Sequence, residues 1–174
     1  MTHVLPPQPF NTHLPMKITY APDRDMSGPL PRVFLAGSIE MGKAEDWQDK
    51  LAKALEGADV SLLNPRRKDW DSSWVQVKEN KQFNEQVTWE LSRMDLANII
   101  VYWFVPGTVS PVTMLELGLH LRDGTAIIVG CPEGFQRKGN IDIVADRYGV
   151  AVYETWESFV AAVRDAISSY HKYT

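Results

Sequence analysis

The stretch that decides the fold is NIIVYWFVPGTVSPVTMLELG, residues 98–118. It begins with an apolar run, 98–104, that lacks the alternation of a half-exposed strand, which is typical of a strand buried on both faces of a sheet. After a short loop, Ser110 suits the N-cap and Pro111 the first position of a helix, so a helix is expected over 111–123. A buried strand followed by a helix is the repeating unit of an α/β fold.

The same alternation of short apolar runs and amphipathic segments continues through the chain after residue 32. The expected strands are 33–37, 59–63, 98–104, 125–130 and 149–153, and the expected helices are 44–57, 81–96, 111–123 and 155–170. They predict a small doubly wound, flavodoxin- or Rossmann-like α/β domain over residues 32–174, with five parallel strands and helices on both faces. Ligands of such folds bind beyond the carboxyl ends of the strands, where the strand order reverses.

Residues 1–31 differ from the rest, because they hold seven of the eleven prolines and show little periodicity. We interpret them as a proline-rich N-terminal arm. A short strand-like piece, 16–21, is able to add to a sheet edge. Two interpretations stay open: a disordered leader, and an ordered arm that wraps the body or a second subunit.

The composition restricts the partners. The 18 basic and 22 acidic residues give a formal charge of −4 without blocks of like charge, which disfavours nucleic acid and suits a small polar ligand. The chain has no run near the roughly 18 apolar residues of a membrane span and no secretion signal. One cysteine, Cys131, and scattered histidines predict no disulfide, no metal and no cofactor, and we expect a cytoplasmic protein. Cys131 is expected to be a buried apolar side chain.

Four segments fall at the expected ligand-binding edge, and the first is the turn Ala36-Gly37-Ser38. Small residues there either let backbone N–H groups approach a ligand or only close a tight turn. The dinucleotide pattern G-x-G-x-x-G is absent, and Glu40 places negative charge where a pyrophosphate would bind.

The second segment is the loop 64–74, NPRRKDWDSSW, which interleaves charged and aromatic side chains. Such a loop is able to stack a planar ring and bond its edges, or it is a solvated turn with internal Arg–Asp pairs. Two tryptophans, Trp70 and Trp74, are costly to leave in water and indicate that something covers them. The candidate binding residues of this loop are Arg66, Arg67, Asp69, Trp70 and Asp71.

The third and fourth segments each carry a glutamate. Helical spacing places Glu90 on the apolar face of helix 81–96, where it either pairs with a buried cation or lines a site. Desolvation in a site would raise its pKa toward the range of a proton donor. Glu116 follows the helix start and is interpreted as a fixed carboxylate facing a cleft, with Gly118 permitting close packing. The alternative is a surface glutamate of an ordinary helix.

Together these segments resemble the nucleoside 2-deoxyribosyltransferase family and its relatives, the deoxynucleoside monophosphate N-glycosidases. The resemblance covers roughly residues 32–153. It rests on the turn at 36–38, on Glu90 eight residues before Asn98, and on Glu116-Leu117-Gly118 beginning eighteen residues after Asn98.

The resemblance implies that Glu116 is the nucleophile, which attacks C1′ of the sugar and forms a covalent glycosyl ester. Glu90 stands where the family usually has an aspartate that assists the base or binds the sugar hydroxyls. Ser110 takes the place of an aspartate in the transferases and of a phosphate-binding serine in the hydrolases, whereas Asn98 is expected to be structural. Asn140 lies one residue from the place of an asparagine that enters the neighbouring subunit's site, which implies a homodimer or a higher homo-oligomer.

Three functions stay open, and a small-molecule nucleoside or nucleotide is the partner in each. A transferase moves the sugar to a second base and is favoured; a nucleoside monophosphate N-glycosidase passes it to water; a sensor of the same fold only binds. Ser110 favours the hydrolase. Arg66, Arg67 and Lys43 are able to receive a phosphate, whereas Glu40 would oppose one.

Overall fold

The computed structural model describes residues 15–40 and 44–173. Within them, six parallel strands form one open sheet in the order β1-β3-β2-β4-β5-β6. The strands are β1 (Lys17–Tyr20), β2 (Arg32–Gly37), β3 (Ser61–Asn64), β4 (Ile99–Trp103), β5 (Ala126–Gly130) and β6 (Val152–Tyr153). The helices are α1 (Trp47–Ala54), α2 (Lys81–Asp95), α3 (Pro111–His120), α4 (Lys138–Arg147) and α5 (Trp156–Tyr173). The predicted fold class is confirmed.

Two elements differ from the expected set. The sixth strand, β1, comes from the 16–21 piece and pairs in parallel with β3 at the sheet edge. Helix α4 is absent from the expected helices because its apolar stripe is short: it buries only Ile141 and Ala145, and Ile143 on another side is 73% exposed. Without β1 the strand order is that of flavodoxin-like sheets.

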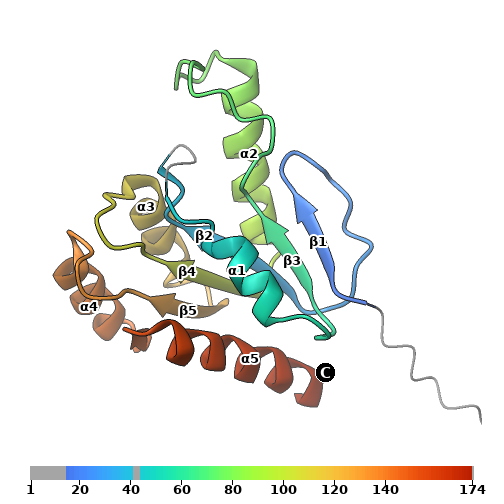
Figure 1. The fold of residues 1–174 in the computed structure, drawn as a ribbon, viewed down its shortest axis with the longest axis vertical. Helices are drawn as coiled ribbons and strands as arrows, with labels where there is room; N and C mark the ends of the chain where they lie inside the picture. Colours follow the sequence, from blue (N-terminus) through green and yellow to red (C-terminus); the bar gives the residue numbers. More distant parts are fainter. Residues whose placement is uncertain (1–14, 41–43, 174) are drawn as a thin grey trace, which may run out of the picture.

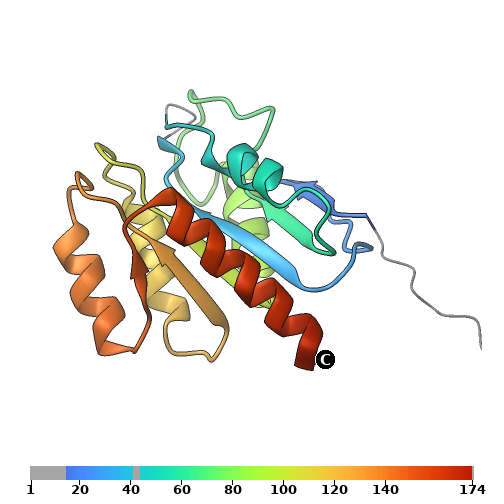
Figure 2. The same ribbon diagram turned by 60° about the horizontal axis from the view of Figure 1, so that its bottom comes forward.

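Alternate residues of the central strands face two separate layers of helices. In β2, Val33 and Leu35 pack with α1 and α5, whereas Phe34 and Ala36 pack with α2, α3 and α4. Figure 2 shows α1 and α5 in front of the sheet and α2 and α3 behind it. Because both faces are covered, these strands are apolar without alternation, as the sequence indicates.

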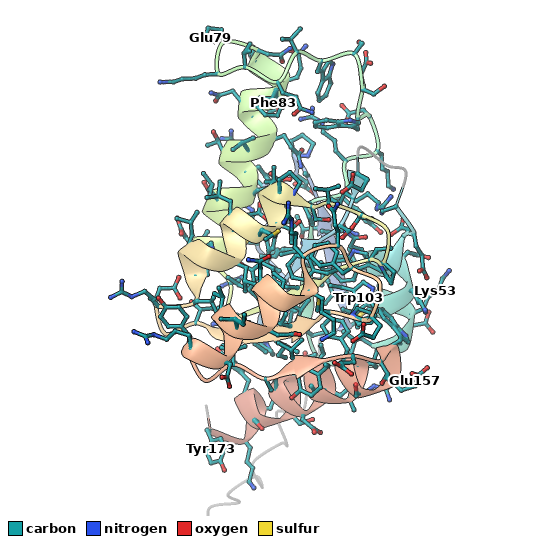
Figure 3. All side chains as sticks on the ribbon, turned by 90° about the vertical axis from the view of Figure 1, so that its left-hand side faces the viewer. Lys53, Glu79, Phe83, Trp103, Glu157 and Tyr173 are labelled. Carbon is teal, nitrogen blue, oxygen red and sulfur yellow. The ribbon has the colours of Figure 1, made fainter. Side chains whose placement is uncertain are left out.

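The strand order reverses at β2, which positions the site. The chain leaves β2 through α1 to β3 on one side, and then crosses through α2 to β4 on the other side. The connections therefore diverge at the carboxyl ends of β2 and β4, where such sheets leave room for a ligand. Figure 1 shows the loop before α2 and the start of α2 reaching past this edge, and Figure 3 places Phe83 in that outer part.

Gly37 ends β2 at a point with no space for a side chain. A Cβ there would lie 2.5 Å from the carbonyl oxygen of Trp103 and 2.5 Å from the ring of Trp47. The glycine thus lets β2, β4 and α1 meet closely beside the site.

Among the described helices, none has the length and apolar character needed to cross a bilayer.

Candidate active site

A cavity of about 350 Å³ opens at the carboxyl edge of the sheet, where the strand order reverses. Its walls come from the four segments that the sequence places there. Its polar and aromatic lining includes Glu40, Arg66, Arg67, Trp70, Gln76, Phe83, Gln86, Glu90, Ser110, Thr113 and Glu116. Segments that are far apart in the chain therefore line one cavity.

Glu116 lies on the second turn of α3 and lines the cavity with only 8% of its surface exposed. The helix is held against β2, because the hydroxyl of Thr113 donates to the carbonyl oxygen of Gly37 at 3.0 Å. His120 Nδ1 donates to the carbonyl oxygen of Glu116 at 2.8 Å, and the hydroxyl of Tyr102 lies 3.4 Å from the same nitrogen. The backbone that carries this carboxyl group is therefore fixed from several sides.

Glu90 reaches the same cavity from α2, and its carboxyl group is held by an amide. Gln86 Nε2 donates to Glu90 Oε1 at 2.9 Å and to the carbonyl oxygen of Pro65 at 2.8 Å. The amide oxygen of Gln86 is buried and has no hydrogen-bond partner within the described ranges. Gln86 is not among the residues predicted for the site, although its position one helical turn before Glu90 is a usable signal.

Burial changes the protonation of both carboxyl groups. Desolvation raises the pKa of Glu90 to about 7, and the hydrogen bond from Gln86 opposes this rise. Desolvation raises the pKa of Glu116 to about 8, and the negative charge of Glu90 adds to the effect. Burial therefore moves the ionisation of both carboxyl groups toward neutral pH.

Ser38 lies behind the cavity wall and organises the loop that leads into α3. Its hydroxyl accepts from the backbone N–H of Val105 at 2.9 Å and lies 2.9 and 2.6 Å from the hydroxyls of Thr108 and Ser110. Ser110 is the N-cap residue of α3, as expected, but its side chain does not bond to the backbone of the helix. Ser110 has a left-handed backbone, with φ of 42°, and its hydroxyl makes no cap bond to α3 because it binds Ser38.

A carboxylate from another segment binds the backbone directly before α3. Glu40 Oε1 accepts from the backbone N–H of Ser110 at 2.9 Å and of Val109 at 3.2 Å, and the Ser110 hydroxyl lies 3.4 Å away. Glu40 also has a left-handed backbone, with φ of 48°. A negative charge at the N-terminal end of a helix is favourable.

The loop after β3 contributes a cation and an aromatic wall. Arg67 donates to both carboxylate oxygens of Asp69, at 2.7 and 3.2 Å, and to Glu85 at 3.0 Å. Trp70 packs edge-on against Trp74, with ring centroids 5.1 Å apart. The indole N–H of Trp70 is buried without a hydrogen-bond partner in the described part of the chain. Trp70 lines the cavity, whereas Trp74 supports it from behind.

The other two candidates of this loop have different surroundings. Arg66 lines the cavity and donates to the carbonyl oxygens of Glu45 and Ala44 at 3.1 and 3.4 Å. Asp71 accepts from the backbone N–H of Ser73 at 2.8 Å and, like Asp69, is exposed outside the cavity lining. Lys43 lies outside the described residues.

The remaining predictions have mixed outcomes. Asn140 is exposed on α4, away from this cavity. Asn98 is structural, as expected, because its side chain accepts from the backbone N–H of Arg32 at 2.8 Å. The packing role predicted for Gly118 is wrong, since a Cβ there would meet open space. Cys131 is buried, as expected, and burial raises the pKa of its thiol to about 12.

An open parallel sheet with two carboxyl groups of raised pKa in a cavity at its switch point defines an α/β protein with an enzyme-like small-molecule site. The chain belongs to the nucleoside 2-deoxyribosyltransferase-like family, whose model matches residues 30–135. The matched segment runs from β2 to the loop after β5 and includes the whole cavity lining, whereas Asn140 lies beyond it. Membership of this family indicates an enzyme that acts on nucleosides. The search of curated proteins gives no match.

Proposed function

We propose that the protein cleaves the N-glycosidic bond of a nucleoside and transfers the sugar, through a covalent ester on Glu116. The observation that carries this proposal is the presence of a buried carboxyl group, Glu116, and a half-buried one, Glu90, in one cavity. N-glycosidic cleavage needs an ionised carboxylate near the anomeric carbon and a proton donor for the departing base. Burial raises the pKa of both groups toward neutral pH, where Glu90 is able to hold the donated proton once Glu116 ionises.

In the first step a carboxylate oxygen of Glu116 forms a bond to C1′ while the bond from C1′ to the base nitrogen breaks. The electron pair of that bond goes to the base, which receives the proton of Glu90. Positive charge develops on the sugar in the transition state, and this charge favours the ionised form of the neighbouring Glu116. The proton of the pair is then held by Glu90, where the leaving group needs it.

In the second step the acceptor attacks C1′, the ester bond breaks, and Glu90 takes the acceptor's proton. A second base as acceptor makes the protein a transferase, and water makes it a hydrolase. The aromatic face of Trp70 suits a planar acceptor base, and its indole N–H is a polar group without a partner in the described ranges. We therefore favour transfer of a deoxyribosyl group between bases.

The test incubates the protein with 2′-deoxynucleosides, with and without a second free base, and separates the products by chromatography. We expect exchanged nucleoside when the second base is present. Free base released equally without an acceptor would show a hydrolase, and no product in either case would contradict the proposed chemistry. Glu116→Gln removes the nucleophile, so its turnover should fall at least a thousandfold while its circular dichroism spectrum stays unchanged.

We further propose a homo-oligomer built on the face beside the cavity. Val112, Leu115 and Leu119 lie on one side of α3 and are 58%, 64% and 55% exposed. Val112 also lines the cavity, so the apolar face continues into its rim. Burial of such a stripe against a second copy would remove it from water and complete the wall of the site.

A further inference from the structure

The N-terminal end of α3 forms part of the cavity wall, and a carboxylate of the protein already occupies it. Ser110, Pro111 and Val112 line the cavity together with Glu40. Backbone N–H groups at such a helix end bind anions, phosphates in particular. Here the N–H groups of Val109 and Ser110 donate to Glu40 Oε1 at 3.2 and 2.9 Å. Glu40 therefore occupies the two backbone N–H groups directly before the helix.

The cations of the cavity are also engaged by protein groups. Each nitrogen of the Arg67 guanidinium donates to Asp69 or Glu85. Arg66 donates to backbone carbonyl oxygens and lies 3.4 Å from a carboxylate oxygen of Asp46. Both arginines of the described lining therefore already have acceptors, whereas Glu40 adds a carboxylate to the wall. This balance disfavours a second negative charge on the substrate.

Glu40 lines the cavity beside the start of α3, whereas Glu116 lies further along this helix. Glu116 lies six residues after Ser110, which is about 9 Å along a helix of 1.5 Å rise per residue. A sugar with its C1′ beside Glu116 reaches Glu40 when its far substituent points along the cavity wall toward the start of α3. The negative carboxylate of Glu40 meets that end of the substrate.

We propose that Glu40 is a specificity residue that excludes phosphorylated substrates and selects the neutral nucleoside. This inference rests on the proposed function, because it assumes that the sugar lies beside Glu116. A phosphate would have to displace Glu40 from its two backbone N–H bonds or accept its repulsion. The free hydroxyl group of an unphosphorylated nucleoside is able to donate to the carboxylate of Glu40 instead.

The test measures binding in the inactive Glu116→Gln protein, with and without Glu40→Ala, by isothermal titration calorimetry. The ligands are the four common 2′-deoxynucleosides, their 5′-monophosphates and inorganic phosphate. We expect Glu116→Gln to bind at least one nucleoside tenfold or more tightly than its monophosphate. Adding Glu40→Ala should shift this preference at least tenfold toward the monophosphate and create binding of inorganic phosphate.

The controls separate a local effect from a global one. Glu79→Ala removes an exposed carboxylate outside the cavity and should leave the preference unchanged. Glu40→Gln keeps an oxygen for the two backbone bonds but removes the charge, so its preference should lie between those of the parent and Glu40→Ala.

The outcomes distinguish this inference from the function on which it rests. Nucleoside binding with a preference that Glu40→Ala does not change would overturn the role of Glu40 and leave the proposed function standing. No binding of any nucleoside or nucleotide to any variant would overturn both. A monophosphate that binds the parent as tightly as the nucleoside also refutes the exclusion.

Discussion

Replacement of Glu90 by glutamine tests whether the cavity withholds water from its carboxyl groups. The folded protein raises the pKa of Glu90 from 4.5 to about 7, so it keeps a proton that the unfolded chain releases. The free energy of unfolding therefore falls as the pH rises through this interval. Each pKa unit corresponds to about 1.4 kcal/mol, so the ionised side chain costs ~3 kcal/mol above pH 7. Glutamine has the shape of the protonated acid and carries no charge.

We expect Glu90→Gln and the parent to be equally stable at pH 4, where both have a neutral side chain at this position. The difference should grow between pH 4.5 and 7 and reach ~3 kcal/mol in favour of the variant at pH 9. Urea titrations at each pH, followed by tryptophan fluorescence, measure it because Trp47 and Trp103 are buried. With slopes of about 1–3 kcal/mol per molar urea, the midpoint should shift by about 1–3 M.

Glu79→Gln is the matched control, because Glu79 is an exposed carboxylate at the outer end of the α2 region (Figure 3). It should change the free energy of unfolding by less than about 0.5 kcal/mol at every pH. A gain in Glu90→Gln that was equal at pH 4 and pH 9 would show that packing, not charge, is responsible. No gain at pH 9 would mean that the carboxyl group is hydrated in the folded protein.

Three further changes address other parts of the site. Gly37→Ala should destabilise the fold by about 2 kcal/mol in urea titrations, because the new Cβ would collide with the Trp103 carbonyl oxygen and the Trp47 ring. Trp70→Ala should raise KM about tenfold and lower kcat much less, because it removes an aromatic wall and no reacting group. Asn140→Ala should lower activity only if the protein is oligomeric, since Asn140 is remote from its own cavity, and light scattering that shows an active monomer would refute this role.

The sequence predicts the fold well because the fold depends on local patterns. Apolar runs without alternation mark strands buried on both faces, and β2, β4 and the α3 start follow from them. The errors have local causes too. Helix α4 has only a short apolar stripe, and β6 is limited to Val152–Tyr153 within the expected run of 149–153.

The sequence predicts the site residues that helical spacing and chain order reveal, and it does not predict the contacts between distant segments. Glu90 and Glu116 are found because each breaks an apolar face, and the switch point brings them to one cavity. The hydrogen bonds at the start of α3 are not predicted. The bonds of Ser110 to Ser38 and Glu40 join residues 72 and 70 positions apart, and a pattern read along the chain carries no information on such pairs. Local propensity favours a serine cap, and tertiary contacts override it.

The carboxyl groups in the cavity lower the free energy of unfolding of the protein. Two carboxyl groups that ionise near neutral pH are costly for a folded chain, and a core of apolar side chains on both faces of the sheet offsets that cost. A purely structural role would be served better by glutamines at both positions, which would remove the charge and keep the shape. Residues that weaken the fold in this way are expected where their protons are used. The gain in stability and the loss of turnover should therefore appear together when Glu116 is replaced by glutamine.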